Sequence, residues 1–263
     1  MPKSEVQIEL ITKKDIRSPE IGREVFNILK TSSEKVLPEY VSKIEPVNIR
    51  IDSLETWLEH WSSPECSRYE GVTHDFDSGL IWRRRKSLKS WGAVTHGHDL
   101  IHQGSSVFIS STWNKSVEWE SIFDLLVGII EPEYAGIHVF GSDELSMRKS
   151  GEPFQVLAIW KLVSYKYEGN WRRPDSFDLK AWRDYRHLPD LPFKAYLSQG
   201  FKDQYDLSKL EEIGCLKHKG KGVYVKIADD LDFVVNDFPS FTTKRKKVRS
   251  AFSTGFFTEL NEI

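Results

Sequence analysis

The alternation of apolar and polar residues predicts strands in several parts of this chain. In residues 6–11, Val-Gln-Ile-Glu-Leu-Ile, apolar side chains recur with the period of a half-buried strand. Residues 107–113 are rich in β-branched and aromatic side chains, which favours a further strand. The same reasoning predicts strands at 47–51, 80–91, 134–140 and 193–197, and a hairpin over 216–227 that turns at its glycines.

Apolar residues at helical spacing predict several helices between these strands. Ser18-Pro19-Glu20 combines an N-cap, a proline at the first helical position and an acid in the first turn. Residues 116–130 give the strongest helical pattern, which Pro132 stops. Shorter helices are predicted at 52–61, 179–185, 206–214 and 244–252, and residues 154–163 fit either a strand or a helix.

This order of elements predicts an α+β fold, with packed helices and one or more mixed or antiparallel sheets. The strand–helix–strand unit over 107–140 is expected at its centre. Both halves of the chain contain such elements. Two organisations stay open: a single domain over 1–263, or two related lobes over 1–145 and 146–263.

The composition narrows the function classes. The 263 residues carry 37 basic and 39 acidic side chains, and this balance creates no global field for nucleic acid or an anionic membrane. The longest apolar run, 125–130, is far too short to span a bilayer, and the first residues lack the apolar core of a signal peptide. Two distant cysteines make neither a disulfide framework nor a thiolate zinc site. We therefore expect a cytoplasmic protein without a cofactor or a membrane partner.

The histidines His96, His98 and His102 form the most prominent cluster with metal-binding chemistry. Imidazoles at this spacing can share a metal ion if a strand leads into a loop, which makes a metal-dependent hydrolase one alternative function. The spacing differs from that of the helical HExxH zinc site, and a polar surface loop is the simpler explanation of the cluster.

A basic run, Arg83-Arg84-Arg85-Lys86, lies between Trp82 and Trp91. Basic side chains beside aromatic rings can bind single-stranded nucleic acid. A nucleic-acid-binding accessory protein is therefore the second alternative function, with the basic residues of 244–249 as a further contact. Consecutive arginines on a strand point to opposite faces, however, and do not form one patch.

No motif of an enzyme nucleophile or of a nucleotide-binding loop is found. The chain has no GxSxG elbow, and Gly220-Lys221-Gly222 is too short for a phosphate-binding loop. We therefore expect a protein that is not an enzyme.

Two stretches carry a resemblance to a known family. Residues 122–136 form a helix that ends near a proline and leads into a strand. After Pro192 come a strand at 193–198, Gly214, the glycine-containing hairpin at 219–227, Asn236 and a basic helix. This order resembles the immunity protein 52 family of bacterial polymorphic toxin systems. The resemblance implies a non-enzymatic inhibitor of a cognate toxin that acts in the cytosol, such as a nuclease, and it supplies no catalytic residues.

Candidate partner-binding residues follow from the chemistry of such a complex. An inhibitor of a basic nuclease is expected to present carboxylates, because complementary charge speeds association and sets specificity. Tryptophan and arginine are enriched among interface hot spots. The candidates are Asp143, Glu144, Trp171, Arg172, Asp229, Asp230 and Asp232.

Overall fold

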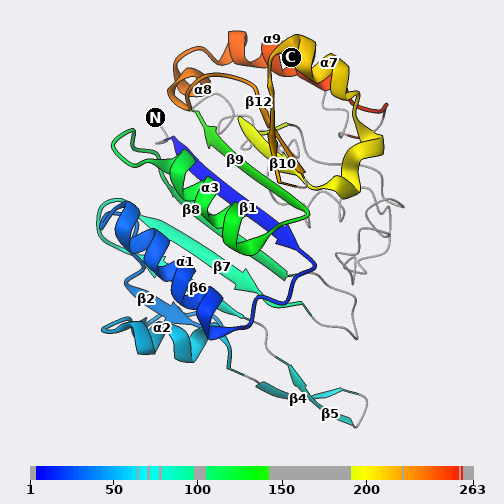
Figure 1. Cartoon of the computed structure of the whole chain (residues 1–263). Helices are drawn as coiled ribbons and strands as arrows, with labels where there is room; N and C mark the ends of the chain where they lie inside the picture. The colour runs from blue at the N-terminus through cyan, green and yellow to red at the C-terminus, as the bar shows by residue number, and fades with distance from the viewer. Residues whose placement is uncertain are drawn as a thin grey trace, which may run out of the picture. The chain divides into compact units, whose positions relative to one another are not determined.

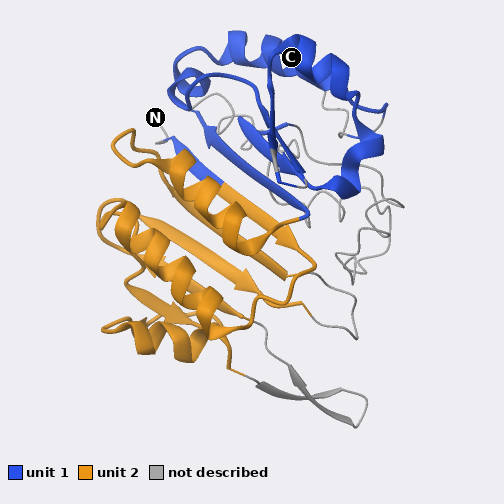
Figure 2. Ribbon diagram, in the orientation of Figure 1, with its two compact units in different colours: residues 1–7, 133–263 blue, residues 8–132 orange. Residues whose placement is uncertain are grey.

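The computed structural model describes residues 4–63, 65–69, 72–76, 79–97, 105–141, 191–220, 222–254 and 256. The chain divides into two compact units: unit 1 contains residues 1–7 and 133–263, and unit 2 contains residues 8–132 (Figure 2). Helices and antiparallel strands occur in both, which confirms the α+β prediction. The elements predicted at 154–163 and 179–185 lie outside the described residues.

Unit 2 is built on a sheet with the strand order β1-β8-β7-β6-β2-β3. The pairs from β8 to β3 are antiparallel. The strands are β1 (Glu5–Thr12, of which residues 8–12 belong to this unit), β2 (Tyr40–Ser42), β3 (Ile49–Arg50), β6 (Leu80–Arg84), β7 (Ser90–Thr95) and β8 (Ser105–Thr112). A separate hairpin joins β4 (Glu65–Tyr69) to β5 (Val72–Phe76).

One strand prediction in unit 2 is wrong. The sequence predicts a single strand over 80–91, but the chain turns between β6 and β7. The apolar residues of β6 stop at Trp82, and the polar residues 85–87 that follow β6 lie in the turn. The strand predicted at 47–51 is also shorter, since only the two residues of β3 pair.

Three helices lie on the same side of the unit 2 strands (Figure 1). They are α1 (Pro19–Ser32), α2 (Leu54–Trp61) and α3 (Trp119–Ile130). The predicted cap of α1 is confirmed, because the Ser18 side chain accepts a hydrogen bond from the Ile21 N–H. The cap of α2 is Ser53, whose hydroxyl accepts from the Thr56 N–H at 3.3 Å, so this helix begins two residues after the predicted start at 52.

Three tryptophans form the centre of the unit 2 core. The Trp57 ring lies 5.8 Å from Trp61 and 5.5 Å from Trp82, measured between centroids. Trp57 Nε1 donates to the Gly22 carbonyl and Trp61 Nε1 to the Ile16 carbonyl, each at 2.9 Å. Trp57 and Trp61 are thus fully buried with their indole N–H donors paired, and they belong to the core.

The Trp82 ring covers Gly92, its partner on the neighbouring strand. A Cβ atom at Gly92 would lie 2.0 Å from an atom of that ring. We therefore expect Gly92→Ala to lower the free energy of unfolding by about 1–3 kcal/mol, as measured by urea denaturation. Gly128→Ala is the matched control: its Cβ meets nothing within 4 Å, and removing a helical glycine stabilises by up to about 1 kcal/mol. Equal stability of Gly92→Ala and the wild type would contradict the packing.

Unit 1 holds a four-stranded antiparallel arrangement in the order β11-β12-β10-β9. Its strands are β9 (Tyr134–Phe140), β10 (Lys194–Leu197), β11 (Leu216–Lys219) and β12 (Gly222–Lys226). The predicted strands at 134–140 and 193–197 and the hairpin over 216–227 are confirmed. The helices of this unit are η3 (Gln199–Gln204), α7 (Leu207–Ile213), α8 (Asp232–Asn236) and α9 (Phe238–Arg249).

Local signals define the helix ends in unit 1. Asp206 caps α7 by accepting from the Lys209 N–H at 3.0 Å, and Gly214 ends the helix with a φ of 78°, as predicted. The last helix, α9, begins six residues before the predicted start at 244, because Asp237 accepts from the Ser240 N–H and Pro239 occupies the first turn. None of the described helices has the length and apolar character that crossing a membrane requires.

Candidate functional site

The face of the unit 2 sheet opposite the helices carries a row of aromatic and arginine side chains. Cross-strand pairing places Trp91 (β7) opposite Arg83 (β6), Arg83 opposite Tyr40 (β2), and Tyr40 opposite Arg50 (β3). Paired residues of antiparallel strands project to the same side. Since Trp82, beside Arg83, is buried against α2, these four side chains point away from the core. We call them the aromatic–arginine row.

Three of the four members of this row are open to solvent. Trp91 is 46% exposed, although its ring also contacts Phe108 of β8 with centroids 4.7 Å apart. The Arg83 side chain is 48% exposed and that of Arg50 is 75% exposed. The row therefore combines a large aromatic surface with guanidinium groups that a partner can reach.

Carboxylates accompany the arginines of the row. Arg83 forms an ion pair with Glu45 at 2.5 Å, and Arg50 forms one with Asp52 at 2.9 Å. Such exposed pairs contribute only about 0–1 kcal/mol each to stability. Their structural effect is to hold each guanidinium in one orientation and to reduce the positive potential of the face.

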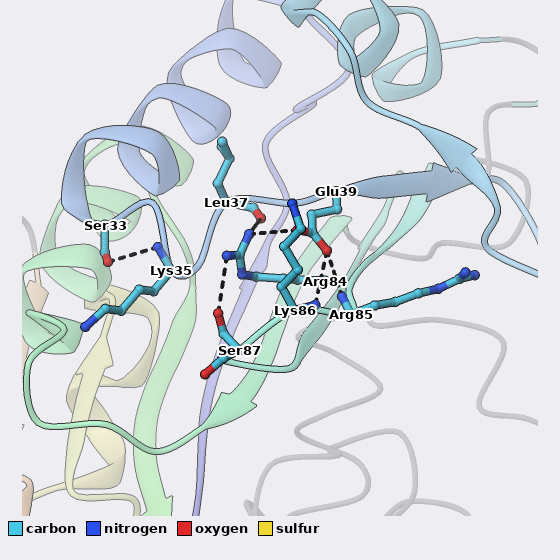
Figure 3. Close-up of polar contacts among 8 residues, drawn as sticks. All are labelled: Ser33, Lys35, Leu37, Glu39, Arg84, Arg85, Lys86 and Ser87. Carbon is cyan, nitrogen blue, oxygen red and sulfur yellow. Dashed lines mark hydrogen bonds and ion pairs between the residues drawn. The ribbon is translucent and has the colours of Figure 1, made fainter.

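The basic run predicted from the sequence is organised around Glu39, which precedes β2. The Glu39 carboxylate accepts from the backbone N–H groups of Arg85 and Lys86 at 3.0 and 3.2 Å. It also pairs with the Arg84 guanidinium and the Lys86 ammonium, each at 3.3 Å. Figure 3 shows the carboxylate between these groups, with the Arg85 side chain extending away from it.

This arrangement confirms that the arginines of the run do not form one patch. Arg83 belongs to the open face, while Arg84 turns to Glu39 and donates to the carbonyls of Leu37 and Ser87. The Arg85 guanidinium lies 4.4 Å from the centre of the Tyr40 ring and donates to the Val47 carbonyl at 3.0 Å. The basic run therefore has a structural role in closing the β6–β7 turn onto β2.

Glu39 is ionised more readily than an ordinary glutamate. Burial by itself would raise the pKa of this carboxyl. The N–H groups of Lys86 and Arg85, the Lys86 ammonium and the Arg84 guanidinium outweigh burial, so that the pKa lies below its ordinary value of 4.5.

The second basic segment, at 244–249, is also partly internal. Arg245 of α9 is buried, with its guanidinium 5.2 Å from the centre of the Phe241 ring. Lys244 lies over the Phe233 ring at 4.6 Å. This helix face therefore does not present a continuous set of solvated cations.

Of the three candidate metal-ligating histidines, the structure describes His96. It is buried, and its Nε2 donates to the Trp61 carbonyl, while its ring packs edge-on against the Trp61 indole. In this arrangement Nε2 is engaged with the backbone of α2. His98 and His102 lie outside the described residues. In the part of the chain that the structure describes, no three His, Cys, Asp or Glu side chains gather to hold a metal ion.

The acidic candidates of unit 1 lie at the start of α8. The Asp230 carboxylate, two residues before this short helix, accepts a hydrogen bond from the Phe233 N–H in the first turn at 2.8 Å. Asp232 is in its first turn, and the exposed Asp229 receives a hydrogen bond from Lys226 at its backbone carbonyl. Asp143, Glu144, Trp171 and Arg172 lie outside the described residues.

Glu9 of β1 is a buried titratable group that the sequence pattern assigned to a polar face. The prediction that residues 6–11 form a half-buried strand is wrong about burial. Glu9 is 4% exposed, and every described residue of β1 after Glu5 is buried. The Glu9 Oε2 atom has no hydrogen-bond partner. Burial raises the pKa of this carboxyl well above 4.5, since the charged form loses its hydration.

We expect Glu9→Gln to change how stability depends on pH. Between 4.5 and the raised folded pKa, folded Glu9 holds a proton that the unfolded chain has released. Wild-type stability therefore falls as pH rises through this window, by up to about 1.4 kcal/mol per pH unit. The glutamine variant lacks this loss and gains on the wild type with rising pH. Urea denaturation across pH measures the difference, with the exposed Glu24→Gln as the control. Parallel curves for wild type and Glu9→Gln would contradict the expectation.

No protein-family model matches this chain, and the search of curated proteins finds no match.

Proposed function

We propose that this chain is a cytoplasmic binding protein that neutralises a cognate bacterial toxin by occluding it, and that it is not an enzyme. The observation that carries the proposal is the open face of unit 2, where Trp91, Tyr40 and Arg83 stand on neighbouring strands. Tryptophan, tyrosine and arginine are the residue types that dominate binding hot spots between proteins. The resemblance to the immunity protein 52 family supplies the class of partner.

The charges on this face favour a protein over nucleic acid. A phosphate backbone is bound mainly by cations that are free to replace its counterions. Here Arg83 and Arg50 already pair with the carboxylates of Glu45 and Asp52, so they are not free to replace the counterions of a phosphate backbone. Glu39 in turn engages Arg84 and Lys86.

Nucleic acid remains the second candidate because of one feature, the aromatic rings on the sheet. Trp91, Phe108 and Tyr40 offer flat surfaces on which bases could stack. Salt separates the two functions: binding to nucleic acid falls steeply with salt concentration, whereas a protein complex centred on aromatic residues does not.

Affinity capture tests the proposal. The tagged chain is used to retain proteins from a lysate of its source organism at low and high salt, and mass spectrometry identifies what is bound. The expected result is one stoichiometric, salt-resistant protein whose expression alone arrests growth. Recovery of nucleic acid that is released by salt would contradict the proposal, and so would a stoichiometric partner that is harmless when expressed.

A further inference from the structure

We propose that the aromatic–arginine row binds an acidic segment of the protein partner, in which carboxylates flank an apolar or aromatic side chain. This inference rests on the proposed function and adds the sign of the partner's charge. It reverses the expectation drawn from the acidic loops, which would call for a basic partner.

The ion pairs around the row link more cations than carboxylates. Glu39, Glu45 and Asp52 are the carboxylates that the described ion pairs connect to Arg50, Arg83, Arg84 and Lys86. Arg85 joins the same network through the ring of Tyr40. Arg84 and Glu39 pair with each other away from the open face, which leaves four cations beside two carboxylates. This excess positive charge favours an acidic surface and opposes a basic one.

Arg85 supplies a group suited to a carboxylate. Stacking on Tyr40 fixes the plane of its guanidinium, and the one hydrogen bond described for this guanidinium goes to the Val47 carbonyl. A guanidinium has five N–H donors, so a fork of donors remains for a carboxylate of the partner. Because the group is already oriented, little side-chain entropy is lost when it binds.

Apolar surface beside the arginines argues for a protein as the occupant. Trp91 and Phe108 pack together at one end of the row, and Ile44, in the turn after β2, is 71% exposed. An exposed aliphatic side chain contributes nothing to a phosphate backbone but adds buried area in a protein interface. An acidic segment with an apolar anchor satisfies both the excess charge and this surface.

Selection from random short peptides displayed on phage tests the inference with a defined probe. The wild-type chain is expected to enrich peptides in which Asp or Glu stands beside an aromatic or aliphatic residue. Their affinity should fall by at least about tenfold in Trp91→Ala and in Arg85→Glu. Two controls on the helix side, Leu125→Ala and Arg23→Glu, match the loss of exposed apolar surface and the charge change, and should leave the affinity unchanged.

An NMR measurement on the wild-type chain tests the inference without depending on whether the variants fold. The indole N–H resonance of Trp91, assigned through Trp91→Phe, should shift when an enriched peptide is added. No shift would overturn the inference.

Other results of the peptide selection would overturn the inference or assign binding to a different surface or ligand. Enrichment of basic peptides, or of peptides whose affinity is unchanged in both Trp91→Ala and Arg85→Glu, would overturn the inference. If the binding of basic peptides is lost in Asp229→Lys, the chain still binds a protein partner, but through the acidic loop that contains Asp229. Tighter binding of single-stranded oligothymidine than of any peptide, lost in Trp91→Ala, would assign the face to nucleic acid. Enrichment of no peptide would count against the inference, while the capture experiment decides the proposed function independently.

Discussion

Replacing Glu39 by alanine is expected to lower the free energy of unfolding by about 2–3 kcal/mol, because it removes the acceptor that four donors share. The N–H groups of Arg85 and Lys86 lose their partner, and so does the mostly buried Arg84 guanidinium. Glu39→Gln keeps one oxygen acceptor but not the charge, and we expect about half that loss. Chemical denaturation at neutral pH measures both, and the exposed Glu59→Gln serves as the control.

The stability difference between the wild type and Glu39→Gln is also expected to depend on pH. Folding lowers the pKa of Glu39, so its contribution to stability is fully present above 4.5 and is lost as pH falls through the lower folded pKa. The stability gap between wild type and Glu39→Gln should therefore close in acid. A gap that stays constant with pH would show that the charge of Glu39 does not hold the turn.

Trp57→Ala is expected to have the largest effect on stability, about 3–5 kcal/mol, because it opens a cavity in the unit 2 core. The ring contacts Phe26, Trp61 and Trp82, and its N–H satisfies the Gly22 carbonyl. Trp91→Ala removes a side chain of the same size from the open face and should cost far less. Similar losses in thermal and urea denaturation for the two variants would contradict the assignment of one tryptophan to the core and the other to a surface.

Signals that act within a few residues explain most of what could be predicted of the fold. The start of α1 at Ser18-Pro19 and the end of α7 at Gly214 depend on a cap, a proline and a left-handed glycine. The burial of Glu9 could not be predicted in this way. An alternating strand predicts one polar face, but the structure buries both faces of β1, which no local pattern records.

The candidate site was predictable only in part. Strand geometry was enough to separate Arg83 from Arg84. The partner of Arg84 was not predictable, because Glu39 lies 45 residues away and reaches it only through the pairing of β2 with β6. The aromatic–arginine row was missed for the same reason, since its four members come from four strands that the chain visits in a different order. A run of like charge in the sequence does not reveal the carboxylate that the fold brings beside it.

Growth rescue tests the central claim most directly. The captured partner is expressed from an inducible promoter in a host that lacks it, alone or with this chain. We predict that the partner alone arrests growth, that the wild-type chain restores it, and that the folded double variant Trp91→Ala, Arg83→Glu does not. Growth without arrest, or equal rescue by wild type and double variant, would contradict a toxin-neutralising protein that binds through the open face of unit 2.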